Sequence, residues 1–325
     1  MVRDRERDAS ASPGDAAVPI RAGRAAQRVL RACCWGTRGS LPSPGPHTAR
    51  FGGNTSCLHV ETPQGRSLIF DAGSGIRRLG DRLAVPGRSV DVDIFLTHFH
   101  WDHIQGLPFF GPLYDPEARL RLHGARQGDV DMPTLVAGQM GPVYFPIPYE
   151  AVAAQLSFHH LDEEDPRVDG VAVDALRVRH AAHTYGYRIS AGEARLAFIP
   201  DNELRGGHYP VAEGWYDELV RFLDGVDVLF HDAMYTSQEY EAHVGWGHSS
   251  FEDAVTLAER AGVRRLYLFH HAPERSDDEL DRAVERLRDD VARRGGTLEV
   301  HAAAEGQELT VSAGLLAPGH EEAGP

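Results

Sequence analysis

The chain has 325 residues, of which 42% are hydrophobic and 25% are charged, a balance typical of a folded globular protein rather than a disordered one. Asp and Glu total 48 against 33 Lys and Arg, so the formal net charge is -15. That charge argues against binding to a long nucleic acid, because proteins neutralise the phosphate backbone with basic side chains. A small anion is not excluded, since a metal centre can reverse the field inside one pocket.

Both ends of the chain differ in composition from the segment between them. Residues 1–27 are charged and rich in small residues but lack the apolar core of a signal peptide, and residues 315–325 are expected to form a second loose tail. No apolar run approaches the length needed to span a bilayer, and the three cysteines show no Cys-x-x-Cys spacing, which suits a reducing compartment. We therefore predict a cytoplasmic protein without membrane contact, in which flexible ends flank one domain over residues 28–314.

Short apolar runs bounded by glycine-rich turns predict strands along most of this domain. The first expected strand covers residues 67–70 and leads into a turn at 71–75. The other expected strands cover residues 90–97, 175–178, 186–190, 194–199, 226–230 and 265–269. The Pro- and Gly-rich stretches 39–56 and 138–150 predict loops, and the aromatic residues of the second loop either line a pocket or anchor it to the core.

Two helices near the C-terminus have clear start signals. Ser250 lies three residues before Asp253, and Ser276 lies three residues before Glu279, which is the spacing of a capping box. Apolar residues recur at helical spacing after both serines, and Gly262 ends the first segment. Both helices are expected to pack on the outside of a sheet.

The segment LTHFHWDHIQG, residues 96–106, places three histidines and an aspartate within six positions directly after a predicted strand. His98 and His100 project to the same side of the strand end, and Asp102 and His103 follow on the next turn. Imidazole and carboxylate groups are ligands that zinc, iron and manganese accept. The pattern therefore predicts a metal site.

This H-x-H-x-D-H motif resembles the signature of the metallo-β-lactamase fold hydrolases, and the resemblance extends over about residues 34–281. It implies a four-layer αββα sandwich, in which two mixed sheets are flanked by helices, with a two-metal site at one edge of the sheets. The family pattern also points to His180, Asp201 and His270 as the remaining ligands. His183 and His271 are rival candidates for the histidine positions, and a helix N-cap is the alternative role of Asp201.

The resemblance also implies how the ligands divide between two divalent metal ions. One ion would be held by His98, His100 and His180 and the other by Asp102, His103 and His270, with Asp201 and a hydroxide between them. Zinc is the expected metal, with manganese or iron as alternatives. Asp71 is expected to support the metal histidines without being a ligand.

A second motif, G-H-S-S at residues 247–250, resembles the ribonuclease Z-like small phosphodiesterase branch of this family. In that branch the histidine contacts the scissile phosphate, so His248 inherits this role, with helix capping or turn closure as its alternative. Asp232 falls where ribonuclease Z carries a glutamate, and the shorter acid is expected to orient His248. Asp102 is expected to guide the proton of the nucleophilic water in addition to binding metal.

The expected substrate is small. Ribonuclease Z grips tRNA with an arm between its third histidine and its bridging aspartate, but His180 and Asp201 are only 21 residues apart. The resemblance therefore implies a phosphodiesterase that acts on a small anionic substrate, such as a cyclic nucleotide, through a metal-bridging hydroxide. The alternatives are a lactone or acyl-ester hydrolase, an iron-dependent oxygenase, and a non-enzymatic metal scaffold or sensor. A homodimer is compatible with the resemblance, since relatives are often dimers.

Overall fold

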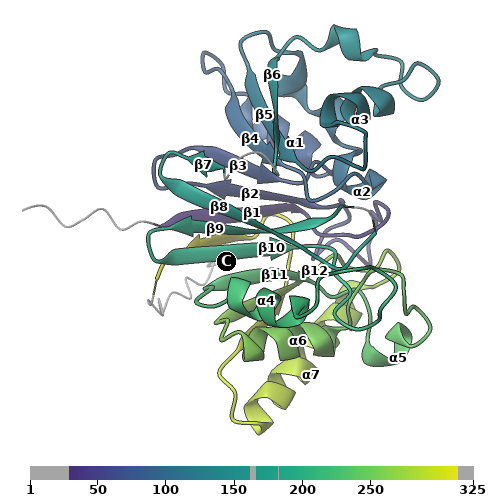
Figure 1. Cartoon of the computed structure of the whole chain (residues 1–325), viewed down its shortest axis with the longest axis vertical. Coiled ribbons are helices and arrows are strands. Elements are labelled where there is room, and N and C mark those ends of the chain that lie inside the picture. The colour runs from purple at the N-terminus through teal and green to yellow at the C-terminus, as the bar shows by residue number, and fades with distance from the viewer. Residues whose placement is uncertain (1–28, 162–165, 182, 314–325) are drawn as a thin grey trace, which may run out of the picture.

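The computed structural model describes residues 29–161, 166–181 and 183–313, so the predicted flexible ends lie outside the described part of the chain. Two seven-stranded sheets lie face to face, and helices cover the outer face of each sheet (Figure 1). The predicted αββα sandwich of two mixed sheets is therefore confirmed.

The first sheet has the strand order β14-β1-β2-β3-β4-β5-β6. Its strands are β1 (Leu30–Gly36), β2 (Cys57–Glu61), β3 (Ser67–Phe70), β4 (Asp91–Phe95), β5 (Arg119–Gly124), β6 (Gln155–His160) and β14 (Glu308–Val311). The pairings from β14 to β3 are antiparallel, and those from β3 to β6 are parallel. The last strand of the chain therefore pairs with the first one.

The second sheet has the strand order β13-β12-β11-β10-β9-β8-β7. Its strands are β7 (Arg167–Val168), β8 (Val171–Arg177), β9 (Tyr185–Ala191), β10 (Ala194–Ile199), β11 (Val228–Asp232), β12 (Arg265–Phe269) and β13 (Glu299–Ala302). The pairings from β7 to β10 are antiparallel and those from β10 to β13 are parallel. The two sheets thus show the same succession of pairings from one edge to the other.

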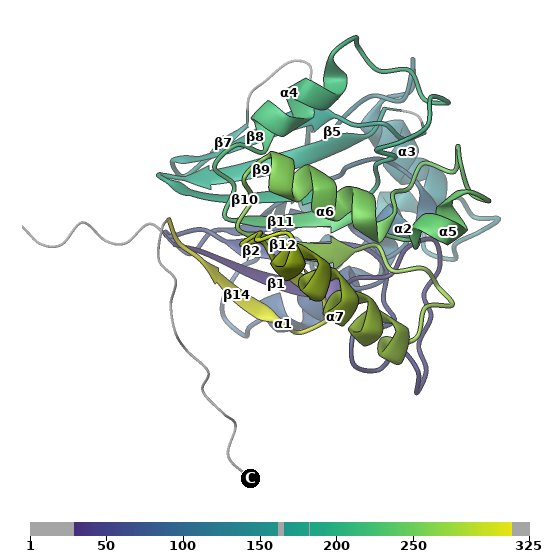
Figure 2. The ribbon, with the colours of Figure 1, turned by 90° about the horizontal axis from the view of Figure 1, so that it is seen from below.

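The helices form the two outer layers. They are α1 (Ile76–Leu83), α2 (Trp101–Ile104), α3 (Met132–Gln139), α4 (Trp215–Phe222), α5 (Ser237–Tyr240), α6 (Phe251–Arg260) and α7 (Asp277–Arg293), and short 3-10 turns cover Leu107–Phe109, Gly111–Tyr114 and Tyr149–Ala151. Figure 2 shows α4, α6 and α7 in front of the second sheet, whereas α1 and α3 lie over the first. Within the described residues, no helix combines the length and apolarity needed to cross a membrane.

Three apolar clusters hold these layers together. Aromatic side chains dominate the layer between the sheets, where Phe70, Phe95 and Phe198 are fully buried and stack or tilt against one another. The other two clusters lie between each sheet and its own helices. Burying a side chain of this size stabilises the fold by roughly 1.5–3 kcal/mol, so the inner layer makes a rigid base for the loops at its end.

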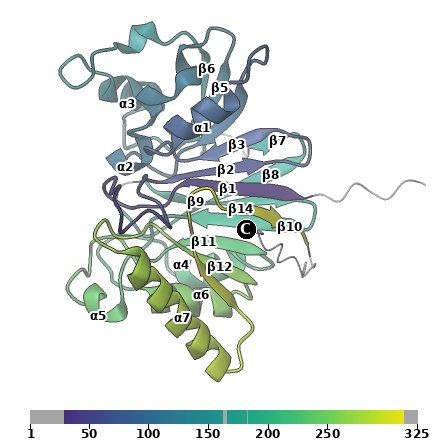
Figure 3. The ribbon, with the colours of Figure 1, turned by 180° about the vertical axis from the view of Figure 1, so that it is seen from behind.

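Several predicted elements are confirmed. The strands expected at 67–70, 194–199 and 265–269 have the predicted bounds, and the other four expected strands are present with shifted ends. Ser250 accepts a hydrogen bond from the Asp253 N–H at the start of α6, and Ser276 forms a full capping box at the start of α7. Figure 3 shows α2, α5 and the loops beside them together at one end of the sandwich.

Candidate metal centre

The segments that follow several strands meet at this end of the sandwich. In parallel strands the carboxyl ends share one edge, so side chains just beyond them come together although they are distant in sequence. His98 and His100 follow β4, His180 follows β8, Asp201 follows β10, and His270 follows β12. Asp102 and His103 lie in α2, which starts one residue after His100.

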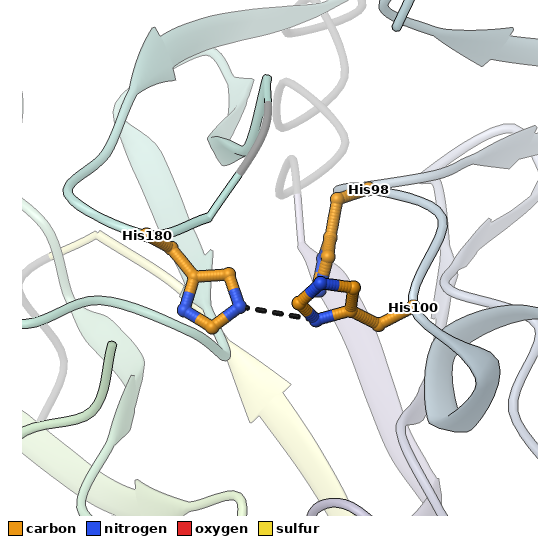
Figure 4. A group of neighbouring side chains, drawn as sticks. All are labelled: His98, His100 and His180. Carbon is orange, nitrogen blue, oxygen red and sulfur yellow. Dashed lines mark hydrogen bonds between the residues drawn. The ribbon is translucent and has the colours of Figure 1, made fainter. Parts of the chain in front are cut away.

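Three histidine rings form the first cluster, which consists of His98, His100 and His180. One ring nitrogen of each lies within 4.8 Å of the other two. Figure 4 shows the rings facing one another, with His180 Nε2 3.2 Å from His100 Nδ1. His98 and His180 are buried and His100 is exposed, so solvent reaches this cluster from the side of His100.

The hydrogen bonds around the first cluster determine which ring nitrogens carry protons. His180 Nδ1 donates to the Gly247 carbonyl at 2.8 Å, which leaves His180 Nε2 with a free lone pair. Thr97 Oγ1 donates to Asp71 and so accepts from His98 Nδ1 at 3.0 Å, which leaves His98 Nε2 free in the same way. Burial lowers the pKa of His98 well below its usual value and that of His180 to about 4. Both rings are therefore in the neutral form that binds metal.

The second cluster consists of Asp102, His103 and His270, and all three side chains are buried. Asp102 Oδ2 lies 3.1 Å from His270 Nε2 and 3.3 Å from His103 Nε2. His103 Nδ1 donates to Asp71 Oδ2 at 2.7 Å, so its Nε2 faces the cluster. The Ser40 N–H donates to Asp102 Oδ2 at 2.7 Å and fixes this carboxylate from the other side. Asp71 therefore has the supporting position that we predicted.

Asp201 lies between the two clusters. Its carboxylate oxygens are 2.9 Å from His103 Nε2, 3.5 Å from His270 Nε2 and 3.7 Å from His180 Nε2. The residue is buried and no helix starts beside it, so the N-cap alternative does not apply. The histidines around it oppose the effect of burial and keep the pKa of Asp201 well below its usual value.

The donor set fits divalent cations. Within the described residues, neither His98 Nε2 nor Asp201 Oδ2 has a hydrogen-bond partner of acceptable geometry, although both atoms are buried. Burial lowers the pKa of His103, but the carboxylates of Asp201, Asp102 and Asp71 raise it well above its usual value. Three carboxylates around one imidazole create a negative field that a bound cation would offset.

His248 lies beside both clusters and is paired with Asp232. Its Nδ1 is 2.9 Å from Asp232 Oδ2 and 3.6 Å from Asp201 Oδ1. Burial lowers the pKa of His248, but the carboxylates of Asp232, Asp201 and Asp102 outweigh this effect and raise it to about 9. Asp232 also accepts the Asn202 N–H at 3.0 Å. The acid thus orients the imidazole and favours its protonated form, which donates hydrogen bonds and is a poor metal ligand.

The structure brings together every ligand candidate predicted from the sequence, together with His248 and Asp232, and metal binding by these residues stays a prediction. The two rival histidines lie outside the clusters. The N–H of His183 donates to the Gln127 side chain, and His271 Nε2 donates to the Ala303 carbonyl at 2.9 Å. Glu203, which accepts hydrogen bonds from the loop before His248, was not predicted as a site residue from the sequence. No motif marks this residue.

A cavity of about 910 Å³ lies elsewhere in the described part of the chain. It is on the outer face of the first sheet, where Trp35, His59 and Arg82 are among its lining residues, and it includes none of the metal-ligand candidates. The chemistry of the donor set, rather than the volume of a cavity, therefore locates the candidate site.

Comparisons with known proteins agree with this geometry. Residues 66–271 match the family described as the beta-lactamase superfamily domain. Ribonuclease Z from Agathobacter rectalis is 26% identical over 295 residues, which cover 77% of this chain and 91% of that protein. The metallo-β-lactamase fold protein YhfI from Bacillus subtilis superposes with a TM-score of 0.62 at 17% identity, covering 87% of this chain and 100% of that one. A diphosphatase from the PhnP family superposes with a TM-score of 0.59 at 20% identity, covering 86% of this chain and 97% of that one.

Proposed function

The chain belongs to the β-lactamase superfamily and is a metal-dependent hydrolase, and from this premise we propose that it hydrolyses a small phosphodiester, such as a cyclic nucleotide. The observation that carries the proposal is the His248–Asp232 pair, held at 2.9 Å beside Asp201. The metal ligands alone would serve several hydrolytic reactions. A protonated imidazole next to them suits a substrate whose reacting group is an anion, which a phosphodiester is and an ester or lactone is not.

The proposed cofactors are two divalent ions. His98, His100 and His180 would hold one, Asp102, His103 and His270 would hold the other, and Asp201 would contact both. Zinc suits this mixture of imidazole and carboxylate, and manganese and iron are the alternatives. When bound, the ions supply Lewis acidity, which activates water at neutral pH and offsets the charge of the phosphoryl oxygens.

The side chains of the site then have distinct tasks. His248 Nε2 forms no hydrogen bond within the described residues, so it is available to donate to a phosphoryl oxygen or to protonate the departing oxygen. Asp232 keeps the ring in place through Nδ1. The proposed role of Asp102, which accepts the Ser40 N–H, is to accept the proton of the attacking water in addition to binding metal.

Three features support a small substrate. Most of the residues between His180 and Asp201 form the hairpin of β9 and β10, so there is no room for a long arm at this position. The net charge of -15 disfavours a polyanion. Trp101, next to His100, and Trp246, two residues before His248, are each 62% exposed. Exposed aromatic side chains beside a phosphate site suit a substrate that carries a base, because bases stack on them.

The test is the steady-state hydrolysis of bis(p-nitrophenyl) phosphate by zinc-loaded protein. We expect turnover by the native chain and by the control His183→Ala, and loss of turnover in His98→Ala and His248→Ala. If protein shown to hold two metal ions has no turnover with zinc, manganese or iron, the phosphodiesterase proposal is wrong. Activity towards a lactone or acyl ester would then identify the alternative.

A second measurement addresses the size of the substrate, because the relative from Agathobacter rectalis is named ribonuclease Z. A 3′,5′-cyclic nucleotide and a precursor tRNA are offered separately to the same protein. Hydrolysis of the cyclic nucleotide alone is expected. Efficient cleavage of the tRNA would contradict the small-substrate part of the proposal and leave the phosphodiesterase part intact.

A further inference from the structure

Glu203 is a fully buried carboxylate that lies two residues after Asp201. Its Oε1 accepts hydrogen bonds from the Tyr240 hydroxyl and the Gly245 N–H, both at 2.7 Å, and its Oε2 accepts one from the Gly247 N–H at 3.3 Å. Buried carboxylates are retained only when such donors satisfy them. Glu203 therefore holds residues 240–247 in place through these hydrogen bonds.

The segment held by Glu203 has a conformation that only glycine adopts readily. Gly245 and Gly247 have φ angles of 87° and 88°, in the left-handed region. Glycine in such a segment loses more backbone entropy on folding than other residues, so the loop needs external contacts to keep one conformation. The two N–H groups bound by Glu203 belong to these two glycines.

Gly247 in turn contacts the first metal cluster. Its carbonyl accepts the proton of His180 Nδ1 at 2.8 Å, and this bond leaves His180 Nε2 free to bind metal. The approach is so close that a Cβ atom at Gly247 would lie 2.3 Å from His180 Nδ1. Any movement of Gly247 is therefore transmitted to the His180 ring.

The backbone beside Glu203 also holds the segment that carries His180. The Glu203 N–H donates to the Arg179 carbonyl at 2.7 Å, and the Arg179 N–H donates to Asn202 Oδ1 at 3.0 Å. Residues 202–203 therefore connect the segment of Asp201, the segment of His180 and the loop before His248.

We propose that Glu203 is a positioning residue for the first metal cluster, His98, His100 and His180, which it orders through Gly247 and the His180 ring. The inference rests on the proposed metal centre and goes beyond it by assigning separate support to each ion. Within the described residues Glu203 makes no hydrogen bond to the second cluster, whose corresponding support is the bond from His103 to Asp71. Loss of Glu203 should therefore lower the affinity for the ion of the first cluster and leave binding of the other ion unchanged.

The test variant is Glu203→Gln, which has nearly the same shape. In either orientation of the amide, its NH₂ group faces the N–H of Gly245 or of Gly247, and two donors cannot bond to each other. Tyr240→Phe is a milder variant, because it removes one donor and leaves both backbone bonds. Glu241→Gln is the matched control, since it neutralises an exposed glutamate next to Tyr240 whose ion-pair partner among the described residues is Arg205, at 3.4 Å.

Metal-free full-length protein is titrated with zinc in competition with a chromophoric chelator, and cobalt is used in parallel because its absorption spectrum reports ligand geometry. We expect native protein and Glu241→Gln to bind two ions. In Glu203→Gln the affinity for one ion should fall by about 10–100-fold, as replacing a group behind a metal ligand typically does. Its cobalt spectrum should change for that ion only. In Tyr240→Phe the affinity for the same ion should fall by a smaller factor.

The outcomes separate this inference from the proposed function. The positioning role is wrong if native protein binds two ions and Glu203→Gln binds both with native affinity. It is also wrong if Glu203→Gln loses affinity for both ions equally. In either case the proposed metal centre stands. If native protein binds fewer than two ions, the metal centre itself is wrong. If circular dichroism shows that Glu203→Gln does not fold, Tyr240→Phe decides, and native affinities in that variant overturn the inference.

Discussion

The two clusters of the metal centre differ in charge and in access to solvent. The first cluster has three imidazoles, one of them exposed, and its support at His180 is a backbone carbonyl. The second cluster is buried and carries carboxylates, with Asp71, Asp102 and Asp201 all close to His103. Opposite charges attract more strongly away from water. We therefore expect the second cluster to retain its ion more firmly and the first to hold the ion that substrate reaches.

The largest expected effect comes from removing the group shared by both clusters. Asp201→Ala takes away a carboxylate that lies within 4 Å of His103, His180 and His270. The affinity for both ions should fall by at least about 100-fold, because a shared ligand contributes more than a supporting group. Metal content after dialysis and hydrolysis of bis(p-nitrophenyl) phosphate measure this loss. Retention of both ions would show that Asp201 is not a ligand.

His248→Gln should affect catalysis and leave both clusters loaded. Its ring lies between them, 5.3 Å from the His180 ring and 4.9 Å from the His270 ring. If it stabilises charge in the transition state, kcat should fall by about 100–1,000-fold with little change in KM. Zinc content by elemental analysis provides the control. A variant that lost an ion as well as activity would place His248 among the ligands.

Asp71→Asn should lower the affinity for the second ion more than that for the first, because Asp71 contacts His103 directly and His98 only through Thr97. It removes the carboxylate that accepts the proton of His103 Nδ1, so the ring is free to turn or to change tautomer. A loss of about 10–100-fold in affinity is expected for the second ion and a smaller loss for the first, whereas Glu203→Gln is predicted to weaken binding of the first ion. Chelator competition distinguishes the two ions. If both variants lower the affinity for the same ion more strongly, the clusters do not act as separate units.

The smallest expected effect is that of Trp246→Ala, which removes an exposed aromatic side chain near the first cluster. Stacking of a base on an aromatic side chain contributes about 1–3 kcal/mol, so KM for a cyclic nucleotide should rise about fivefold or more with kcat retained. A sugar cyclic phosphate without a base is the control substrate, and its KM should not change. Equal effects on both substrates would indicate that Trp246 shapes the loop and does not bind the base.

The metal-ligand candidates could be predicted partly from a local motif and partly from the family resemblance. His98, His100, Asp102 and His103 occupy one short segment, and Asp201 and His270 directly follow strands with continuous apolar sequence. Such strands are buried on both faces, so their residues are recognisable without knowledge of their neighbours. The ligand candidates of this centre are therefore indicated both by motif and by position.

The supporting residues and several strands were not predictable in this way. Glu203 bonds to residues that are 37 to 44 positions away in sequence, and no local pattern indicates such partners. β6, with the sequence QLSFHH, is an edge strand without a fully buried residue, so it lacks the apolar periodicity that identifies a strand. β14, ELTV, has one buried residue and depends on β1 for its pairing. Tertiary contacts, rather than local sequence, determine these elements.

The pairing of β14 with β1 also has a consequence for biosynthesis. The first sheet begins with Leu30, yet its edge is formed by Glu308–Val311 near the other end of the chain. During translation every ligand candidate, including His270, is therefore synthesised before the strand that covers β1. Until then the nascent chain exposes the unpaired N–H and C=O groups of β1, a template for pairing with another chain. Synthesis of β14, not acquisition of the metal-ligand candidates, is thus the event that completes the first sheet.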